Sequence, residues 1–122
     1  MAARVPAANI KLKRAYDPPS PEDGRRILVD RLWPRGISKE KAALDRWMKD
    51  IAPSTELRVR FGHDAKHWEE FRHHYVEELR QHQDLVAELR SLAREGTVTL
   101  VYATRGETHN NAIVLRDVLL GR

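Results

Sequence analysis

The sequence predicts a small α/β domain, a layered sandwich whose mainly parallel, possibly mixed, sheet is flanked by helices. Two continuous apolar runs, residues 27–29 and 97–103, have the composition of strands covered on both faces. Segments with helical apolar spacing separate these runs, which favours a layered α/β fold. At 122 residues the chain has the size of one domain, and we divide it into a flexible tail (residues 1–9) and a single domain (residues 10–122).

The first strand is predicted over residues 10–16, where apolar and basic side chains alternate. Prolines at positions 18, 19 and 21 end it, and residues 20–24 are expected to form one helical turn. The connection to the second strand, residues 17–26, is short for a crossover between parallel strands. The direction of the first strand therefore stays open.

Four helices are predicted from apolar spacing and caps. The first begins at Ser38 as N-cap and continues to Pro53. The second is capped by Asp64 and buries one stripe of side chains. The third ends at Gly96, and the last is capped by Thr108. The buried stripe of the second helix consists of Trp68, Phe71, Tyr75 and Leu79.

Composition limits the function classes. The chain has no cysteine, which excludes disulfides and cysteine-ligated zinc. It has neither a secretory apolar run nor the ~20 apolar residues of a membrane span, so we expect a cytoplasmic, bacterial-type protein without a membrane partner. Residues 1–60 contain 14 Lys/Arg and 8 Asp/Glu, a net charge of +6, whereas residues 61–122 contain 8 and 10, a net charge of −2. A basic half attracts anions, although a solvated mixed-charge surface explains it equally well.

Two segments are predicted to form the functional site, because ligands of open α/β sheets bind beyond the carboxyl ends of the strands. They are residues 30–38 and 104–111, which carry arginines suited to planar recognition of phosphate or carboxylate. The candidate catalytic groups are Asp30 and His109. The candidate ligand-binding residues are Arg31, Trp33, Arg35, Gly36, Arg105 and Asn110. The alternative is structural: Asp30 pairs with Arg31, Trp33 fills the core, and His109 and the asparagines cap the last helix.

We expect no metal and no cofactor. His63 and His67 lie four residues apart, but the residue after His63 is Asp64, whereas the zincin motif requires glutamate there. Spacing places no third ligand. No glycine-rich phosphate loop or nucleophile elbow occurs either.

Residues 28–36, Leu-Val-Asp-Arg-Leu-Trp-Pro-Arg-Gly, resemble the YeaO-like family, the short branch of domain-of-unknown-function family 488. The resemblance covers nearly the whole chain beyond residue 9 and implies a compact α/β sandwich, without naming a substrate. The longer branch of the family has a last helix that begins Cys-His-Arg, where this chain has Thr108, His109 and Asn110. If the longer branch uses its cysteine chemically, that chemistry does not carry over here.

Three functions remain open from the sequence. The first is a protein that binds, or acts on, an anionic, phosphorylated or nucleotide-like small molecule. The second is a nucleic-acid-binding or regulatory protein, and the third is a partner-binding module without a ligand pocket. The oligomeric state is also open. The second function requires the basic residues of the first half to share one exposed face: Lys11, Lys13, Arg14, Arg25, Arg26, Lys39 and Lys41.

Overall fold

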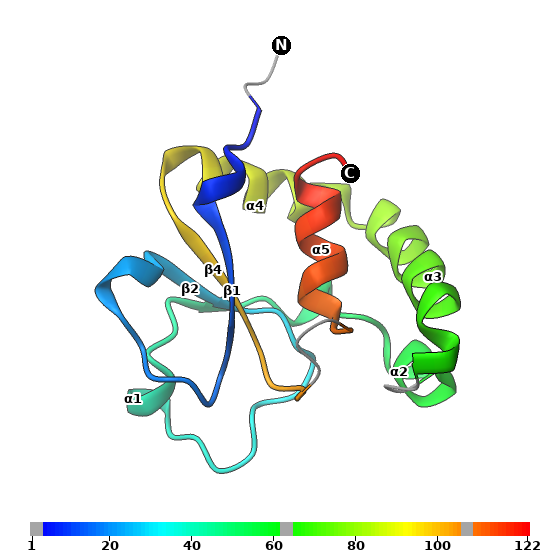
Figure 1. The fold of residues 1–122 in the computed structure, drawn as a ribbon, viewed down its shortest axis with the longest axis horizontal. Coiled ribbons are helices and arrows are strands. Elements are labelled where there is room, and N and C mark those ends of the chain that lie inside the picture. The colour runs from blue at the N-terminus through cyan, green and yellow to red at the C-terminus, as the bar shows by residue number, and fades with distance from the viewer. Residues whose placement is uncertain (1–3, 62–64, 106–108) are drawn as a thin grey trace.

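A four-stranded, fully parallel sheet organises the chain in the computed structural model, which describes residues 4–61, 65–105 and 109–122 (Figure 1). The strands lie in the order β1-β4-β2-β3, and every pairing is parallel. This settles the direction of the first strand. Because β4 lies between β1 and β2, the short connection between these two strands joins strands that do not pair directly. The strands are β1 (Ile10–Arg14), β2 (Arg25–Leu28), β3 (Arg46–Trp47) and β4 (Val98–Tyr102).

The connection between β1 and β2 contains the predicted helical turn, a 3-10 helix η2 (Pro21–Asp23) with Ser20 as its N-cap. It ends at Gly24, whose φ of 61° belongs to the region that favours glycine. A Cβ on Gly24 would lie 2.2 Å from the carbonyl oxygen of Thr97, so the backbone of this turn packs directly on the residue before β4. Glycine at this position lets the turn close against the sheet.

Three helices cover one face of the sheet: α3 (Trp68–Arg80), α4 (Gln83–Glu95) and α5 (Asn111–Leu119). Figure 1 shows α5 beside the strands and α3 outside α5. The three predicted helices of the second half are thus confirmed, and α4 ends at Gly96 as expected. The N-cap of α5 is Asn110, not the predicted Thr108. Thr108 and the other predicted cap, Asp64, lie outside the described residues.

The alternation of side chains along β2 and β4 separates two apolar clusters. Ile27 and Val29 join the large core under the helices, together with Leu100 and Tyr102. Leu28 faces the other way, as does Val101 of β4. The second cluster is covered by the segment between β2 and β3, and the short helix α1 (Lys39–Ala42) lies on this side (Figure 1). The partly buried side chains that cover it are Trp33, Ile37, Leu44 and Trp47.

The predicted long helix from Ser38 to Pro53 is wrong. Ser38 does cap a helix, but α1 ends at Ala43, which adopts a left-handed conformation with φ of 48°. Two residues of the segment then pair with β2 as β3, and a 3-10 helix η3 (Lys49–Ile51) follows. The sequence reading also missed α2 (Thr55–Phe61), whose first turn is capped by the side chain of Ser54.

An ion pair lies between β1, β2 and η2. Arg26 is 3% exposed, and its guanidinium contacts Asp23 at 2.7 Å and the carbonyl oxygen of Ala42 at 2.9 and 3.1 Å. Lys13 contacts the same carboxylate at 3.1 Å. Burial by itself raises the pKa of Asp23, but hydrogen bonds from Lys13, the Ser20 amide and Arg26 outweigh it and lower the pKa below its usual value.

At the N-terminus, residues 7–9 form a 3-10 turn (η1), and the side chain of Asn9 donates a hydrogen bond to the carbonyl oxygen of Ala93 at 2.6 Å. These residues belong to the segment expected as a tail. Within the described ranges, no helix has the length and apolar character needed to cross a membrane.

Candidate functional site

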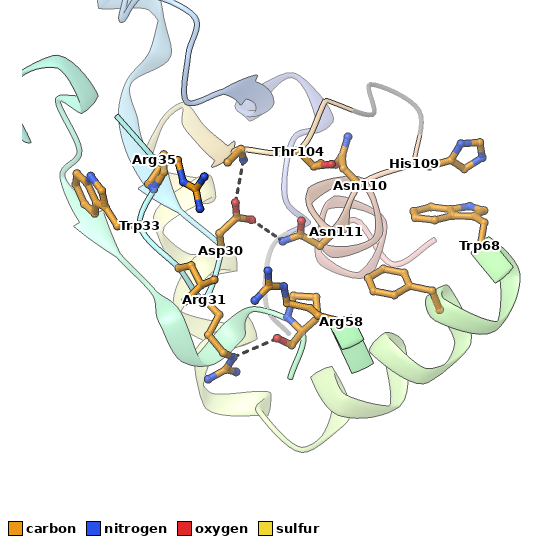
Figure 2. Close-up of a pocket in the computed structure, with 15 residues that line it drawn as sticks. Asp30, Arg31, Trp33, Arg35, Arg58, Trp68, Thr104, His109, Asn110 and Asn111 are labelled. Atoms are coloured by element: carbon orange, nitrogen blue, oxygen red, sulfur yellow. Dashed lines mark hydrogen bonds between the residues drawn. The ribbon is translucent and has the colours of Figure 1, made fainter. Parts of the chain in front are cut away.

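The carboxyl ends of β2 and β4 lie side by side, as the sequence predicted. Asp30 follows β2, and its carboxylate accepts a hydrogen bond from the amide of Ala103, directly after β4, at 2.8 Å (Figure 2). The apolar runs of both strands place them in the centre of the sheet, so their ends meet at the same edge. The two predicted segments therefore form one site.

Asp30 is held from three directions. Its second carboxylate oxygen accepts a hydrogen bond from the side-chain amide of Asn111 at 3.2 Å. The same amide group donates to the carbonyl oxygen of Val29 at 2.9 Å, which ties the start of α5 to the end of β2. The indole of Trp47 donates to the Asp30 carbonyl oxygen at 2.7 Å. This network fixes the orientation of the Asp30 carboxylate.

A pocket of about 460 Å³ opens at this edge of the sheet. Its volume lies within the usual range of small-molecule sites, roughly 300–1,000 Å³. Its lining combines polar, cationic and aromatic side chains from four parts of the chain (Figure 2). The lining residues used below are Asp30, Arg31, Trp33, Arg35, Arg58, Trp68, Phe71, Thr104, His109, Asn110 and Asn111.

The three arginines of the pocket differ in their contacts. Arg31 donates hydrogen bonds to the carbonyl oxygens of Ala52 and Pro53, both at 3.2 Å, so its guanidinium joins the loop after β2 to the segment before α2. In the described part of the chain, the guanidinium groups of Arg35 and Arg58 have no hydrogen-bond or ion-pair partner. We call Arg35 and Arg58 the arginine pair. With Asp30 as the one carboxylate among the lining residues, the pocket is electropositive.

Two of the predicted ligand-binding residues lie outside the lining. Arg105 is exposed and does not line the pocket, and Gly36 lies beyond the lining part of its loop. Gly36 has a φ of 80°, and a Cβ there would meet no atom within 4 Å. Its role is therefore to turn the loop, and no close approach of the backbone to a ligand is needed.

Two other predicted residues line the pocket but also hold the structure. The side chain of Asn110, which is 2% exposed, accepts a hydrogen bond from the amide of Ile113 at 3.0 Å and so caps α5. The indole of Trp33 donates to the carbonyl oxygen of Ile37 at 2.7 Å and packs edge-on against Trp47. For these two residues, the structural alternative explains most of their contacts.

An aromatic wall closes the side of the pocket opposite Arg35 (Figure 2). We define it as Trp68, Phe71 and His109. The rings of Trp68 and Phe71 are stacked with centroids 5.6 Å apart, and His109 meets Trp68 edge-on at 4.8 Å. Phe71 is buried and Trp68 is half-buried, so the predicted buried stripe of α3 also forms a wall of the pocket.

Beneath the pocket, the hydroxyl of Tyr75 donates to the carbonyl oxygen of Ile51 at 2.7 Å. Burial raises the pKa of Tyr75 well above its usual value near 10, and the negative charges of Asp30 and Glu78 raise it further. Tyr75 therefore stays a neutral hydrogen-bond donor at any physiological pH.

Sequence reasoning missed Arg58 as a site residue, along with the role of Trp68 and Phe71 in the lining. The signal for Arg58 was present: Ser54 followed by Glu56 is a pattern that predicts a helix start. The side chain of Ser54 accepts a hydrogen bond from the Leu57 amide at 3.1 Å, and its hydroxyl contacts Glu78 at 2.5 Å. This cap sets the direction of α2 and thereby places Arg58 at the pocket.

Histidines do not gather into a metal site within the described ranges, where no group of three His, Asp or Glu side chains is placed to hold an ion. His67 lies beside Glu70, at 3.8 Å. The partner suggested by spacing, His63, lies outside the described residues.

Comparisons with known proteins place this chain in a family. Residues 9–122 match the family described as DUF488-N3i, the inactive DUF488-N3 subclade. The chain is 49% identical over 111 residues to the uncharacterized protein YeaO of Escherichia coli K12, which covers 91% of this chain and 96% of YeaO. It is 42% identical over 118 residues to the uncharacterized protein Rv3073c of Mycobacterium tuberculosis H37Rv, with 97% and 99% covered. No solved structure gives a significant match.

Proposed function

Since this chain belongs to the DUF488 family, as a YeaO-like member that matches its inactive N3 subclade, we propose that its pocket binds an anionic small molecule. The ligand class is a phosphorylated metabolite or a nucleotide-like molecule. It would occupy the carboxyl ends of β2 and β4, with its anion on the arginine pair.

The observation that carries this proposal is the state of the two guanidinium groups. Elsewhere the buried or half-buried arginines have protein partners: Arg26 pairs with Asp23, and Arg90 caps the end of α5 through the Leu119 carbonyl oxygen. Arg35 and Arg58 line a concave site and have no such partner in the described ranges. Guanidinium groups bind phosphate and carboxylate in a planar, bidentate geometry.

Binding is favoured over catalysis by two features. The matching subclade is described as inactive, and this chain has no cysteine. The candidate base Asp30 accepts hydrogen bonds from Ala103 and Asn111, which keep its carboxylate in the role of an acceptor within the sheet edge. Such a group orients a site without any requirement for proton transfer.

The nucleic-acid alternative has less support. It requires one exposed basic face, but Arg26 is buried against Asp23, and Lys13 contacts the same carboxylate. The guanidinium of Arg14 donates to the carbonyl oxygens of Ala103 and Thr104 at 3.1 and 3.0 Å, beside the pocket. These three side chains stabilise the sheet instead of forming a surface for a phosphate backbone.

The test is a thermal-shift titration of the full chain with phosphate, sulfate, sugar phosphates and nucleotides. Phosphate-bearing ligands should raise the melting temperature, and either Arg35→Ala or Arg58→Ala should abolish this effect while leaving the unliganded melting temperature almost unchanged. Arg60→Ala is the matched control, because it removes the same charge from the same helix outside the pocket. Stabilisation only by divalent metals, reversed by EDTA, or only by oligonucleotides, would overturn the proposal.

A further inference from the structure

The pocket has two chemically different ends, and this asymmetry specifies the ligand more closely. The arginine pair offers positive charge, whereas the aromatic wall offers flat apolar surface on the other side of Asp30 (Figure 2). Resting on the proposed function, we infer that the bound anion is the phosphate of a nucleotide and that its base lies against the aromatic wall.

The aromatic wall is suited to a flat ring. Phe71 is buried and supports Trp68 from below through a stack with an interplanar angle of 21°. Trp68 is only half-buried, so part of its indole faces the pocket, and His109 stands edge-on to it at the rim, at 70°. Aromatic bases bind such surfaces by stacking, and any base can do so because every base has a π-face.

A sugar phosphate without a base would use only half of this pocket. Its hydroxyl groups are hydrated in water, and placing them against Trp68 and Phe71 would remove that hydration without supplying hydrogen bonds. The middle of the pocket, in contrast, is polar: Asp30, Thr104 and Asn111 lie between the two ends. A nucleotide presents its parts in the same order as the pocket, with the phosphate, the sugar hydroxyls and the ring in sequence.

The experiment compares four probes by calorimetric titration: inorganic phosphate, ribose 5-phosphate, adenosine and adenosine 5′-monophosphate. The monophosphate should bind about tenfold or more tightly than ribose 5-phosphate, because stacking of one base contributes at least this factor. His109→Ala, an exposed position, and Trp68→Leu, which keeps apolar contact with Phe71, should each reduce this preference about fivefold or more. Neither variant should change the affinity for ribose 5-phosphate.

The matched control is His73→Ala, which removes an exposed histidine from α3 away from the pocket and should change neither affinity. Equal affinities for ribose 5-phosphate and the monophosphate, or a preference unaffected by both wall variants, would overturn this inference and leave the proposed function intact. If adenosine binds while no phosphate-bearing probe binds more tightly than adenosine, the proposed function itself fails. These outcomes separate the two ideas.

Discussion

Asp23 is the residue whose charge matters most to the sheet. Its side chain lies where β1, η2 and β2 meet, and it accepts hydrogen bonds from Lys13 and Arg26. The hydroxyl of the buried Thr99 donates to its backbone carbonyl oxygen at 2.7 Å, which connects the same residue to β4. Three of the four strands are therefore joined around one carboxylate.

The contribution of Asp23 should depend on pH. Because its pKa is lower in the folded protein than the value near 3.9 of an unfolded chain, the unfolded state binds the proton more readily. The stabilisation is present in full above the unfolded pKa and disappears as the pH falls through the folded pKa. The difference in free energy of unfolding between the wild type and Asp23→Asn should thus be largest near pH 6–7 and shrink below about pH 4.

Urea denaturation at a series of pH values measures this difference directly. Asp50→Asn, at an exposed carboxylate on η3, serves as the control and should follow the wild-type curve. A difference between Asp23→Asn and the wild type that stays constant from pH 7 to pH 2 would show that the carboxylate does not act through its charge.

Site residues could be located from the sequence but not assigned to roles. The position of Asp30 and Arg35 after a buried strand was sufficient to find the pocket, because strand ends in a parallel sheet share one edge. The division of labour among the arginines was not visible, since the carbonyl partners of Arg31 lie more than twenty residues further along the chain. Arg105 looked equivalent to Arg35, and only the loop geometry separates them.

At the scale of elements, α3 carries both stability and the wall of the pocket. Phe71 lies in the large core at 8% exposure, and Tyr75 and Leu79 continue the same face. This part of the predicted stripe is confirmed. Trp68 sits at the helix start, where the core gives way to the pocket, and is therefore only half-buried.

Phe71→Ala should lower the free energy of unfolding by about 3–5 kcal/mol, the usual effect of deleting a core phenylalanine. Val59→Ala, at an α2 position that is 80% exposed, should change it by less than about 0.5 kcal/mol. Chemical denaturation of both variants checks the prediction. A loss below about 1 kcal/mol for Phe71→Ala would mean that this ring belongs to the pocket surface and not to the core.

The failure of the predicted helix at residues 38–52 has a physical cause. The apolar residues there do recur at helical spacing, but Trp47 and Met48 are needed beside β2, where the Met48 amide donates to the Leu28 carbonyl oxygen at 2.9 Å. Pairing with the sheet thus overrides local periodicity. A strand of two residues, β3, gives no alternating pattern that a sequence reading can detect.

At the scale of the whole molecule, β4 holds the sheet together. It pairs with β1 from Ile10↔Val98 to Arg14↔Tyr102 and with β2 from Arg25↔Val98 to Leu28↔Val101. All five of its residues are buried. The strand that joins the two N-terminal strands is therefore the last one in the chain.

A fragment of residues 1–95 should lack a cooperative unfolding transition, because β1 then has no partner strand and the core has lost both β4 and α5. Circular dichroism during urea denaturation measures this, and adding a peptide of residues 96–122 should restore the transition. The matched control adds the same peptide with Leu100→Asp, which places a charge at a fully buried position and should restore nothing. A sharp transition in the fragment alone would contradict this view of β4.

This strand order has a consequence for the protein during its synthesis. The apolar residues of β2 leave the ribosome about 70 residues before β4 does, which corresponds to roughly 4–14 seconds at 5–20 residues per second. During this interval β2 can pair only with the two residues of β3, and β1 cannot pair at all. The nascent chain therefore folds after translation and not during it, and until then its strand edges are open to chaperones and to other nascent chains.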